Sequence, residues 1–208
     1  ILSKSDEGGF IMNRMNDLNC LLAEKLVEDI KKDHEASGIA VAIIDKSGKT
    51  QYEKFWGVRD LESGKEVNGD TIFGLASVTK SFTALSIMQL EEKGIIDLDA
   101  PISQYIPEFT NKNQSKKVTV RHLLSHAGGF FPLPRILVGN VAESLGLDEE
   151  KDGDFAYNDA VAQEGVKLVA ERLDAQTKEN GLNGQPGEYL SYCNDGFGLL
   201  SDIIRRYG

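Results

Sequence analysis

Apolar residues in the first part of the chain follow two different patterns, a helical period and a continuous run, and each pattern predicts one kind of element. Over residues 10–34 the apolar positions recur every three or four residues with charges between them, which predicts one amphipathic helix. Residues 39–44 form a continuous, β-branched apolar run, and residues 50–56 follow as a second predicted strand after a turn that contains a glycine. We expect the two segments to pair as an antiparallel hairpin, so that helix and hairpin begin an α/β layer.

The rest of the chain has helical periodicity that polar and proline-containing connections interrupt. We expect helices at residues 77–92, 120–125, 166–173 and 194–206. Thr119 precedes the second of them and belongs to a residue type that caps helix N-termini. The first helix has an apolar stripe, which predicts a buried face made of Phe82, Leu85, Met88 and Leu90. The last helix carries a similar set, namely Phe197, Leu199, Leu200, Ile203 and Ile204.

Two stretches of the chain predict no regular helix or strand. Residues 57–70 are rich in Gly, Asp, Glu and Lys and predict a loop. Residues 130–165 give no clear pattern because prolines interrupt them, and within them residues 148–154 resemble a mobile loop.

Composition narrows the class of protein. The chain has 208 residues, 40% of them hydrophobic and 27% charged, which fits a globular domain and excludes collagen-like, disordered and membrane-bundle classes. Its net charge of −10 argues against nucleic acid as a partner, because phosphate binding requires clustered Lys and Arg. Cys20 and Cys193 have neither metal-site nor disulfide-scaffold spacing, so we expect free thiols, with a single bridge left open. Because the chain begins at Ile1 rather than Met, we expect that an N-terminal part has been removed, and no localisation follows from the sequence.

The most informative polar cluster is Ser77-Val78-Thr79-Lys80. On a helix, residues three apart lie on one face, so Lys80 can reach the Ser77 hydroxyl. A serine hydroxyl is a weak nucleophile at neutral pH, and an amine whose pKa is lowered by burial or by other cations can take its proton. The free N–H groups at a helix N-terminus would also favour an oxyanion beside Ser77. The same spacing also occurs on surface helices that have no catalytic role.

A second polar cluster, Tyr192-Cys193-Asn194, lies far downstream. The Tyr192 phenol could relay a proton, and the Asn194 amide could hold the lysine or a substrate carbonyl. The residues alone leave a structural alternative open, in which Tyr192 is a half-buried core tyrosine and Asn194 is a helix N-cap.

His122 and His126 have a spacing that would place both on one face of the predicted short helix. The Glu that follows the first His of metalloprotease helices is missing, and glycines end the helix at once, so we expect no metal site. Ser125 beside His126 does not make a catalytic pair, because adjacent side chains on a helix diverge.

Five segments occur together in an order that is typical of one superfamily. From about residue 36 onward the chain resembles the class C β-lactamase-related serine hydrolases, which include penicillin-binding proteins, D-amino-acid peptidases and carboxylesterases. The segments that carry the resemblance are residues 38–44, 73–80, 94–102, 120–130 and 186–194. The resemblance implies an α/β (α+β) fold, with a β-lactamase/transpeptidase-like antiparallel sheet, flanking helices and a mainly helical subdomain. We expect residues 10–74 to form the N-terminal helix and first strands, and residues 75–208 to form the mainly helical part.

Carried over position by position, the resemblance implies roles for four residues. Ser77 would be the acylated nucleophile, Lys80 its activating partner and Tyr192 the proton-relaying residue. Asn194 would bind substrate through hydrogen bonds. The resemblance further implies a small-molecule or peptide substrate, no cofactor and no metal, and it alone favours an extracytoplasmic or secreted location.

Two departures from the family pattern matter. The family's third motif, a Lys or His followed by a small residue and Gly on a strand, is expected after the last helix and therefore beyond Gly208. We therefore expect that a C-terminal segment or chain completes the fold and supplies the second oxyanion donor, and that the isolated chain is unstable or exposes an apolar sheet edge. Cys193 stands where the family commonly has Ser, Ala or Gly. This substitution can make the site sensitive to thiol reagents, and we interpret it as a tolerated small residue.

The expected function is hydrolysis of an amide, β-lactam or ester through an acyl-enzyme. Two alternatives stay open: a non-catalytic penicillin-recognition or interaction module of the same fold, and one chain of a cleaved two-chain hydrolase. The presence of all four candidate site residues favours the enzyme.

Overall fold

The chain divides into two compact units, Ile1–Gly74 and Leu75–Gly208. The structure is a computed structural model that describes residues 7–34, 36–112, 117–134, 136–155, 158–176 and 182–208, with only the backbone described for residues 7–19 and 34.

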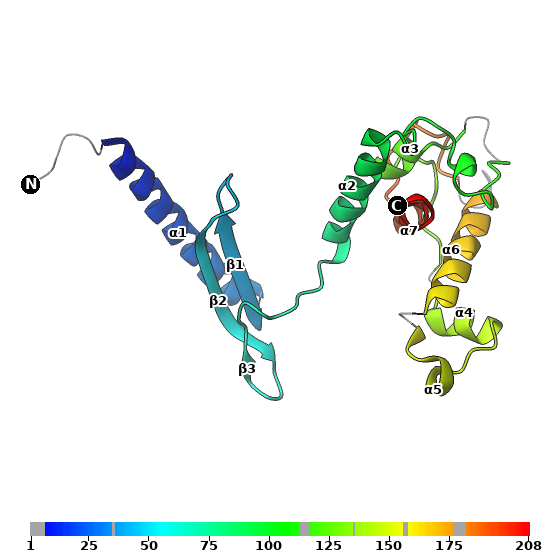
Figure 1. Cartoon of the computed structure of the whole chain (residues 1–208). Helices are drawn as coiled ribbons and strands as arrows, with labels where there is room; N and C mark the ends of the chain where they lie inside the picture. Colours follow the sequence, from blue (N-terminus) through cyan, green and yellow to red (C-terminus); the bar gives the residue numbers. More distant parts are fainter. Residues whose placement is uncertain (1–6, 35, 113–116, 135, 156–157, 177–181) are drawn as a thin grey trace, which may run out of the picture. The chain divides into compact units, whose positions relative to one another are not determined.

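The first unit is a helix followed by a three-stranded antiparallel sheet (Figure 1). Its elements are α1 (Glu7–His34), β1 (Gly38–Ile44), β2 (Thr50–Asp60) and β3 (Lys65–Glu66), in the sheet order β1-β2-β3. The Lys54 ammonium of β2 lies 2.6 Å from the Glu24 carboxylate of α1 and links the helix to the sheet. The predicted helix and hairpin are confirmed.

The predicted loop over residues 57–70 is wrong at its start and in its middle, because β2 continues to Asp60 and β3 pairs with it. Gly57 makes the continuation possible, since its φ of 73° lies in the left-handed region that favours glycine. A Cβ at Gly57 would collide with the Ser37 carbonyl. The sheet therefore depends on a backbone position that a hydrophobic pattern does not reveal.

The second unit is mainly helical in its described residues, with two isolated β-bridges, Pro101 to Thr119 and Phe130 to Leu182. Its helices are the 3-10 turns η1 (Ala76–Val78) and η2 (Ile102–Gln104) and the α-helices α2 (Thr79–Glu92), α3 (Val120–Leu124), α4 (Val138–Ser144), α5 (Glu149–Asp152), α6 (Asp159–Asp174) and α7 (Asn194–Tyr207). Helix α7 packs against α2, α3 and α6 and so forms the centre of this unit (Figure 1).

The core of the second unit is built on the apolar face of α7, as the periodicity predicts. The fully buried Leu199, Leu200 and Ile203 contribute roughly 1.5–3 kcal/mol each through the hydrophobic effect. The core also takes in buried apolar residues from the surrounding helices, among them Ile87, Leu90, Leu123 and Leu173.

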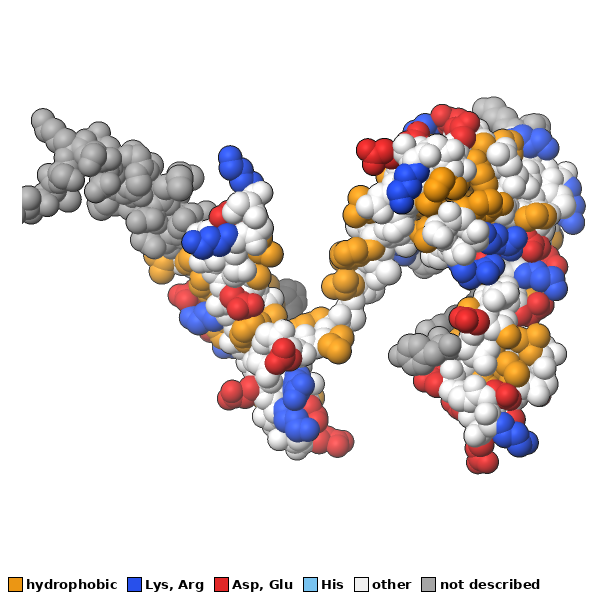
Figure 2. All heavy atoms as spheres, viewed as in Figure 1, with side chains coloured by type: hydrophobic (Ala, Val, Ile, Leu, Met, Phe, Trp, Pro, Cys, Tyr) orange, Lys and Arg blue, Asp and Glu red, His pale blue; other side chains and the backbone are white. Residues whose placement is uncertain are grey.

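The predicted buried stripe on α2 is largely wrong. Phe82, Leu85 and Met88 are 59%, 58% and 44% exposed, and the buried residues of this helix are Ile87 and Leu90. The contact with α7 selects the face that Ile87 and Leu90 share, because residues three apart lie side by side on a helix. Apolar side chains consequently remain on the surface over α2 (Figure 2).

The region that lacked a clear pattern contains two short helices and the first half of α6. The predicted loop over residues 148–154 is wrong for Glu149–Asp152, because α5 forms there with an Asp148 carboxylate oxygen accepting from the Glu150 amide at 3.0 Å. The exposed acidic residues of this segment lie at a helix N-terminus, where the helix dipole favours negative charge. Helix α6 begins at Asp159, seven residues before the predicted start, and its N-cap is Asn158.

No helix among the described residues has both the length and the apolar character that a membrane crossing requires.

Candidate active site

Ser77 lies in a tight turn at the N-terminus of α2. The turn η1 places Ser77 two residues before the helix, and the residue before it, Ala76, has a φ of 45°. A non-glycine residue in this left-handed region is uncommon and costs conformational energy, which functional sites often store. The turn leaves Ser77 exposed, and Lys80 follows as the second residue of α2.

Three of the predicted site residues meet around the Ser77 hydroxyl. The Tyr192 hydroxyl lies 2.8 Å from Ser77 Oγ, and Lys80 Nζ donates to Ser77 Oγ at 3.2 Å. The Lys80 ammonium also lies over the rings of Tyr192 and Phe197, at 5.2 and 5.7 Å from their centroids. Ser77 is therefore in hydrogen-bond contact with one group that can accept a proton and with one cation.

The charge of Lys80 changes the acidity of Tyr192. The pKa of the Tyr192 phenol is lowered, first by its hydrogen bond with Lys80 and then by its hydrogen bond with Ser77, against a smaller opposing effect of burial. Both contacts stabilise the phenolate, because a nearby cation and hydrogen-bond donors favour the charged form of an acid. At a given pH, a larger fraction of Tyr192 is thus in the phenolate form, which can accept a proton, than of a tyrosine in water.

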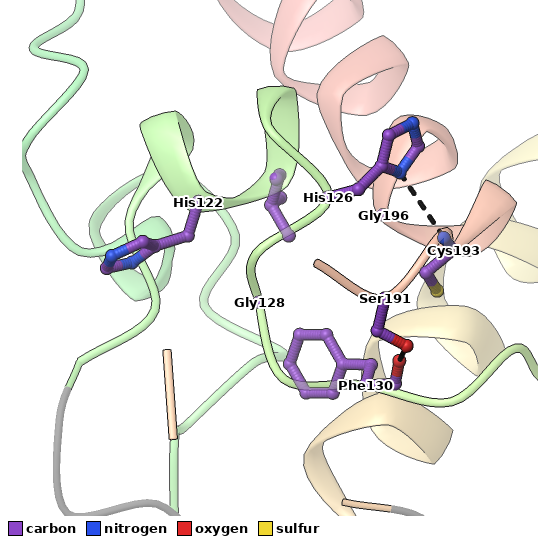
Figure 3. A pocket seen from close by; sticks show the side chains of 8 residues that line it. His122, His126, Gly128, Phe130, Ser191, Cys193 and Gly196 are labelled. Carbon is purple, nitrogen blue, oxygen red and sulfur yellow. Dashed lines mark hydrogen bonds between the residues drawn. The ribbon is translucent and has the colours of Figure 1, made fainter. Parts of the chain in front are cut away.

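Tyr192 belongs to a segment that is hydrogen-bonded to the chain after α3. The Gly187 amide donates to the Ala127 carbonyl at 2.8 Å, and the Ser191 amide donates to the His126 carbonyl at 2.8 Å. The Ser191 hydroxyl adds a bond of 2.6 Å to the Phe130 carbonyl (Figure 3). These bonds hold the segment that delivers the Tyr192 phenol to Ser77.

His126 contacts Tyr192 directly, and the sequence did not identify it as part of the site. Its ring centroid lies 4.2 Å from that of Tyr192 and 5.0 Å from that of Phe197. Its Nδ1 accepts from the Cys193 amide at 3.3 Å (Figure 3). The signal that could have found it is the short distance from the Thr119 cap to the glycine pair after His126, which leaves room for a turn rather than for a longer helix.

The predicted shared face of His122 and His126 is wrong, because α3 ends at Leu124 and His126 follows it with a φ of 54°. The two imidazoles point in opposite directions (Figure 3). His122 instead completes a capping box with Thr119, whose amide donates to His122 Nδ1 at 3.2 Å, which confirms the predicted cap. Within the described ranges, no group of three or more His, Cys, Asp or Glu residues is placed to hold a metal ion.

Asn194 is the first residue of α7 and is exposed, and the N-cap position belongs to Cys193. The structure does not join Asn194 to Ser77 or Lys80 by a hydrogen bond between described residues. The Cys193 thiol is buried, and burial raises its pKa to about 11. The thiol is accordingly a packed neutral group at neutral pH rather than a nucleophile.

The backbone at Ser77 supplies one donor for a developing negative charge. The first hydrogen bond of η1 runs from the Val78 amide to the Leu75 carbonyl, at 3.0 Å. The Ser77 amide precedes that bond and is one of the N–H groups that a helix start leaves without an intrahelical partner. It lies beside the hydroxyl whose attack would create an oxyanion.

Comparison with known proteins identifies the family. A profile of the Beta-lactamase family matches residues 23–207. The chain belongs to the Beta-lactamase family. It is 36% identical to the esterase EstB of Burkholderia gladioli over 116 residues, 54% of this chain and 30% of that protein. It is 30% identical to a penicillin-binding protein of Bacillus subtilis over 185 residues, 88% of this chain and 35% of that protein.

Solved structures of Beta-lactamase relatives confirm the predicted fold class. The octameric penicillin-binding protein homologue from Pyrococcus abyssi is 29% identical with a TM-score of 0.66, over 88% of this chain and 38% of that one. The β-lactamase/D-alanine carboxypeptidase from Pseudomonas syringae shares the fold at 23% identity with a TM-score of 0.65, over 90% of this chain and 44% of that one. This Beta-lactamase chain is thus a member of a serine hydrolase family, and it spans about a third of the length of the two curated relatives.

Proposed function

We propose that the full-length protein is a serine hydrolase that works through an acyl-enzyme on Ser77. The observation that carries the proposal is the double contact of Ser77 Oγ, which lies 2.8 Å from the Tyr192 hydroxyl and 3.2 Å from Lys80 Nζ. A nucleophile in hydrogen-bond reach of its base, with the base held by a third group, is the general arrangement of nucleophilic catalysis.

The two hydrogen bonds suggest different roles for the two partners. A lysine ammonium has donors and no acceptor, so the bond from Lys80 uses a lone pair of Ser77 Oγ. The Ser77 hydrogen is then directed to the Tyr192 oxygen. We assign Tyr192 as the immediate base, in its phenolate form, and Lys80 as the cation that stabilises this form.

In the proposed cycle, Tyr192 accepts one proton and returns it in each of the two half-reactions. Ser77 Oγ attacks the carbonyl carbon, its proton passes to Tyr192, and the carbonyl π pair moves onto the oxygen. The carbon then releases the leaving group, which takes the proton back from Tyr192, and Ser77 is left as an ester. Water attacks this ester after giving a proton to Tyr192, and that proton returns to Ser77 Oγ when the acid product leaves.

The oxyanion is stabilised by the Ser77 amide at the N-terminus of η1 and α2, where the helix dipole also favours negative charge. We propose that the second donor and the remainder of the substrate site come from a C-terminal segment or chain. Asn194 is proposed to bind the substrate, because it is exposed two residues after the base.

The proposed substrate is a small molecule or peptide with an ester, β-lactam or amide carbonyl. This range is supported by two relatives of the chain, an esterase and a penicillin-binding protein. No nucleic acid partner is proposed, in keeping with the net charge of −10.

Intact-mass spectrometry of the full-length protein with a fluorophosphonate or a penicillin tests the nucleophile. One adduct that maps to Ser77, and that is lost in Ser77→Ala, is expected. Folded protein without an adduct at Ser77 would refute the assignment. Turnover of nitrocefin, p-nitrophenyl acetate and D-aminoacyl anilides then separates the substrate classes, and acylation without turnover would instead indicate a penicillin-recognition module.

A further inference from the structure

We propose that the neutral imidazole of His126 is a positioning residue that holds Tyr192 against Ser77, so that protonation of His126 releases the base from the nucleophile. The proposal rests on the proposed function of Ser77 and Tyr192. It concerns a side chain that makes no contact with the Ser77 hydroxyl and that takes no part in the cycle described above.

His126 fixes the backbone on both sides of Tyr192. Its carbonyl accepts from the Ser191 amide at 2.8 Å, and its Nδ1 accepts from the Cys193 amide at 3.3 Å. The residues immediately before and after Tyr192 are therefore both bonded to the same residue, which restricts the direction in which the phenol can point.

His126 also fixes the Tyr192 ring. The two rings lie 4.2 Å apart between centroids with an angle of 32° between their planes, and on α7 the Phe197 ring lies 5.0 Å from the imidazole. Contact between aromatic rings at such distances is favourable beyond the area that it buries. The left-handed backbone of His126, with its φ of 54°, places the imidazole there instead of on the face of α3.

The contact to Cys193 requires one charge state of His126. An imidazole nitrogen accepts a hydrogen bond only when it carries no proton, so the neutral form protonated at Nε2 fits the observed bond. In the imidazolium both nitrogens are donors, and Nδ1 would then face the Cys193 N–H, which is also a donor. Protonation thus replaces an attraction beside Tyr192 with a repulsion.

The groups around His126 oppose its protonation. The pKa of His126 is lowered, first by burial and second by the charge of Lys80 on α2. Among the described residues, the other titratable groups near it are the Tyr192 phenol, the Cys193 thiol and His122, which lines the same small cavity of about 10 Å³ (Figure 3). His126 is therefore neutral at neutral pH and becomes charged only in acid.

Three variants of the full-length protein separate this role from a general effect on folding. His126→Asn offers an amide oxygen near the Nδ1 position and does not titrate. His126→Phe keeps a ring against Tyr192 but has no acceptor for the Cys193 amide. His122→Asn is the matched control, because it removes the imidazole that caps α3 and leaves the contacts of Tyr192 in place.

The readout is the pH profile of kcat/KM for a p-nitrophenyl ester. In the native protein we expect two protonations on the acid side, one at the base and one at His126, so that log(kcat/KM) falls with a slope that approaches two. His126→Asn should fall with a slope of one, His126→Phe should lose at least tenfold at every pH, and His122→Asn should keep the native slope. Equal slopes in His126→Asn and the native protein would overturn the proposal.

A second readout does not depend on catalysis. In protein labelled with 13Cζ-tyrosine, the Tyr192 signal is assigned by its loss in Tyr192→Phe, and we expect it to shift as the His126 imidazole titrates in acid. The signal should not shift over that pH range in His126→Asn. A Tyr192 chemical shift that stays constant while His126 titrates would overturn the proposal. Failure of Ser77 to be acylated would overturn only the proposed function. If His126→Phe does not fold, His126→Asn and the tyrosine signal decide the outcome.

Discussion

The Tyr192 hydroxyl lies 2.8 Å from Ser77 Oγ although 115 residues separate the two in the chain. The contact forms inside one compact unit, since η1 and the segment before α7 both belong to Leu75–Gly208. Ser77 lies two residues before α2 and Tyr192 two residues before α7, so the packing of these two helices brings both residues together. Lys80 contacts both of them from the first turn of α2. Tyr192 thus reaches the serine through the arrangement of two helices rather than through the local sequence.

Removal of the Tyr192 hydroxyl should abolish most acylation. Tyr192→Phe keeps the ring against His126 but leaves Ser77 without its proton acceptor, and loss of a general base typically costs about 10²- to 10⁴-fold. The measurement is the rate of fluorophosphonate labelling by intact mass. Tyr189→Phe is the control, because Tyr189 is also exposed in this segment and has no hydrogen bond to Ser77. Equal losses in both variants would remove Tyr192 from the mechanism.

Removal of the Lys80 charge should move activity to higher pH. Lys80 lowers the pKa of Tyr192, so the phenolate is available at a lower pH than in a free tyrosine. In Lys80→Met the pKa of Tyr192 should rise, and the acid limb of the pH profile of the acylation rate should shift to higher pH. The same variant should also lose rate at the optimum, because the donor to Ser77 Oγ is gone.

The comparison for Lys80 is Lys93→Met, which removes an exposed charge at the other end of α2. This variant should keep the native pH profile. The pKa of Tyr192 can be followed directly by 13Cζ-tyrosine titration, and an unchanged value in Lys80→Met would show that the lysine acts in another way.

Elements that depend on local pattern were predicted well from the sequence. The hairpin follows from a β-branched apolar run and the turn after it, α7 follows from the helical period of 3.6 residues, and the Thr119 cap follows from one residue type. The exposed face of α2 was not predicted, because an apolar stripe indicates which residues can be buried and not which neighbour covers them. The extension of β2 past Gly57 likewise depends on the Ser37 carbonyl from another segment.

The candidate site shows the same division. The contact between Ser77 and Lys80 follows from helical spacing, whereas the place of Tyr192 beside them came from the order of motifs and not from any local signal. His126 was assigned to a helix face because its distance from His122 is four residues. The left-handed backbone that turns it toward Tyr192 is imposed by the bonds of the following segment, which only the folded unit displays.

Cys193 should be inert toward thiol reagents in the folded protein, although it is adjacent to the proposed base. It is 5% exposed, and burial raises its pKa to about 11, so both access and thiolate content are low. In a Cys20→Ala background, 5,5′-dithiobis(2-nitrobenzoate) should react with Cys193 only after unfolding in guanidinium. Rapid reaction in native buffer, with loss of Ser77 acylation, would show that the thiol is open to the site.

The buried carboxylate of Asp174 should be a main contributor to the stability of the second unit. It ends α6 with 4% exposure and accepts from the Thr110 amide at 3.0 Å, the Thr110 hydroxyl at 2.6 Å and the Lys112 amide at 3.2 Å. Asp174→Ala removes three hydrogen bonds to a charged acceptor. One such bond contributes about 1.5–3 kcal/mol, and water can replace part of them because Thr110 and Lys112 are exposed, so a total of about 3 kcal/mol is expected.

Urea unfolding of the full-length protein, monitored by far-ultraviolet circular dichroism, measures this loss of stability as a lower urea concentration at the midpoint of unfolding. Asp99→Ala is the matched control, because Asp99 pairs with Arg121 at 2.7 Å on the surface. Exposed ion pairs contribute little, since water screens them and the side chains lose entropy, so the control midpoint should hardly move. Equal midpoints for the two variants would mean that the Thr110 and Lys112 donors find water or other acceptors when the carboxylate is gone.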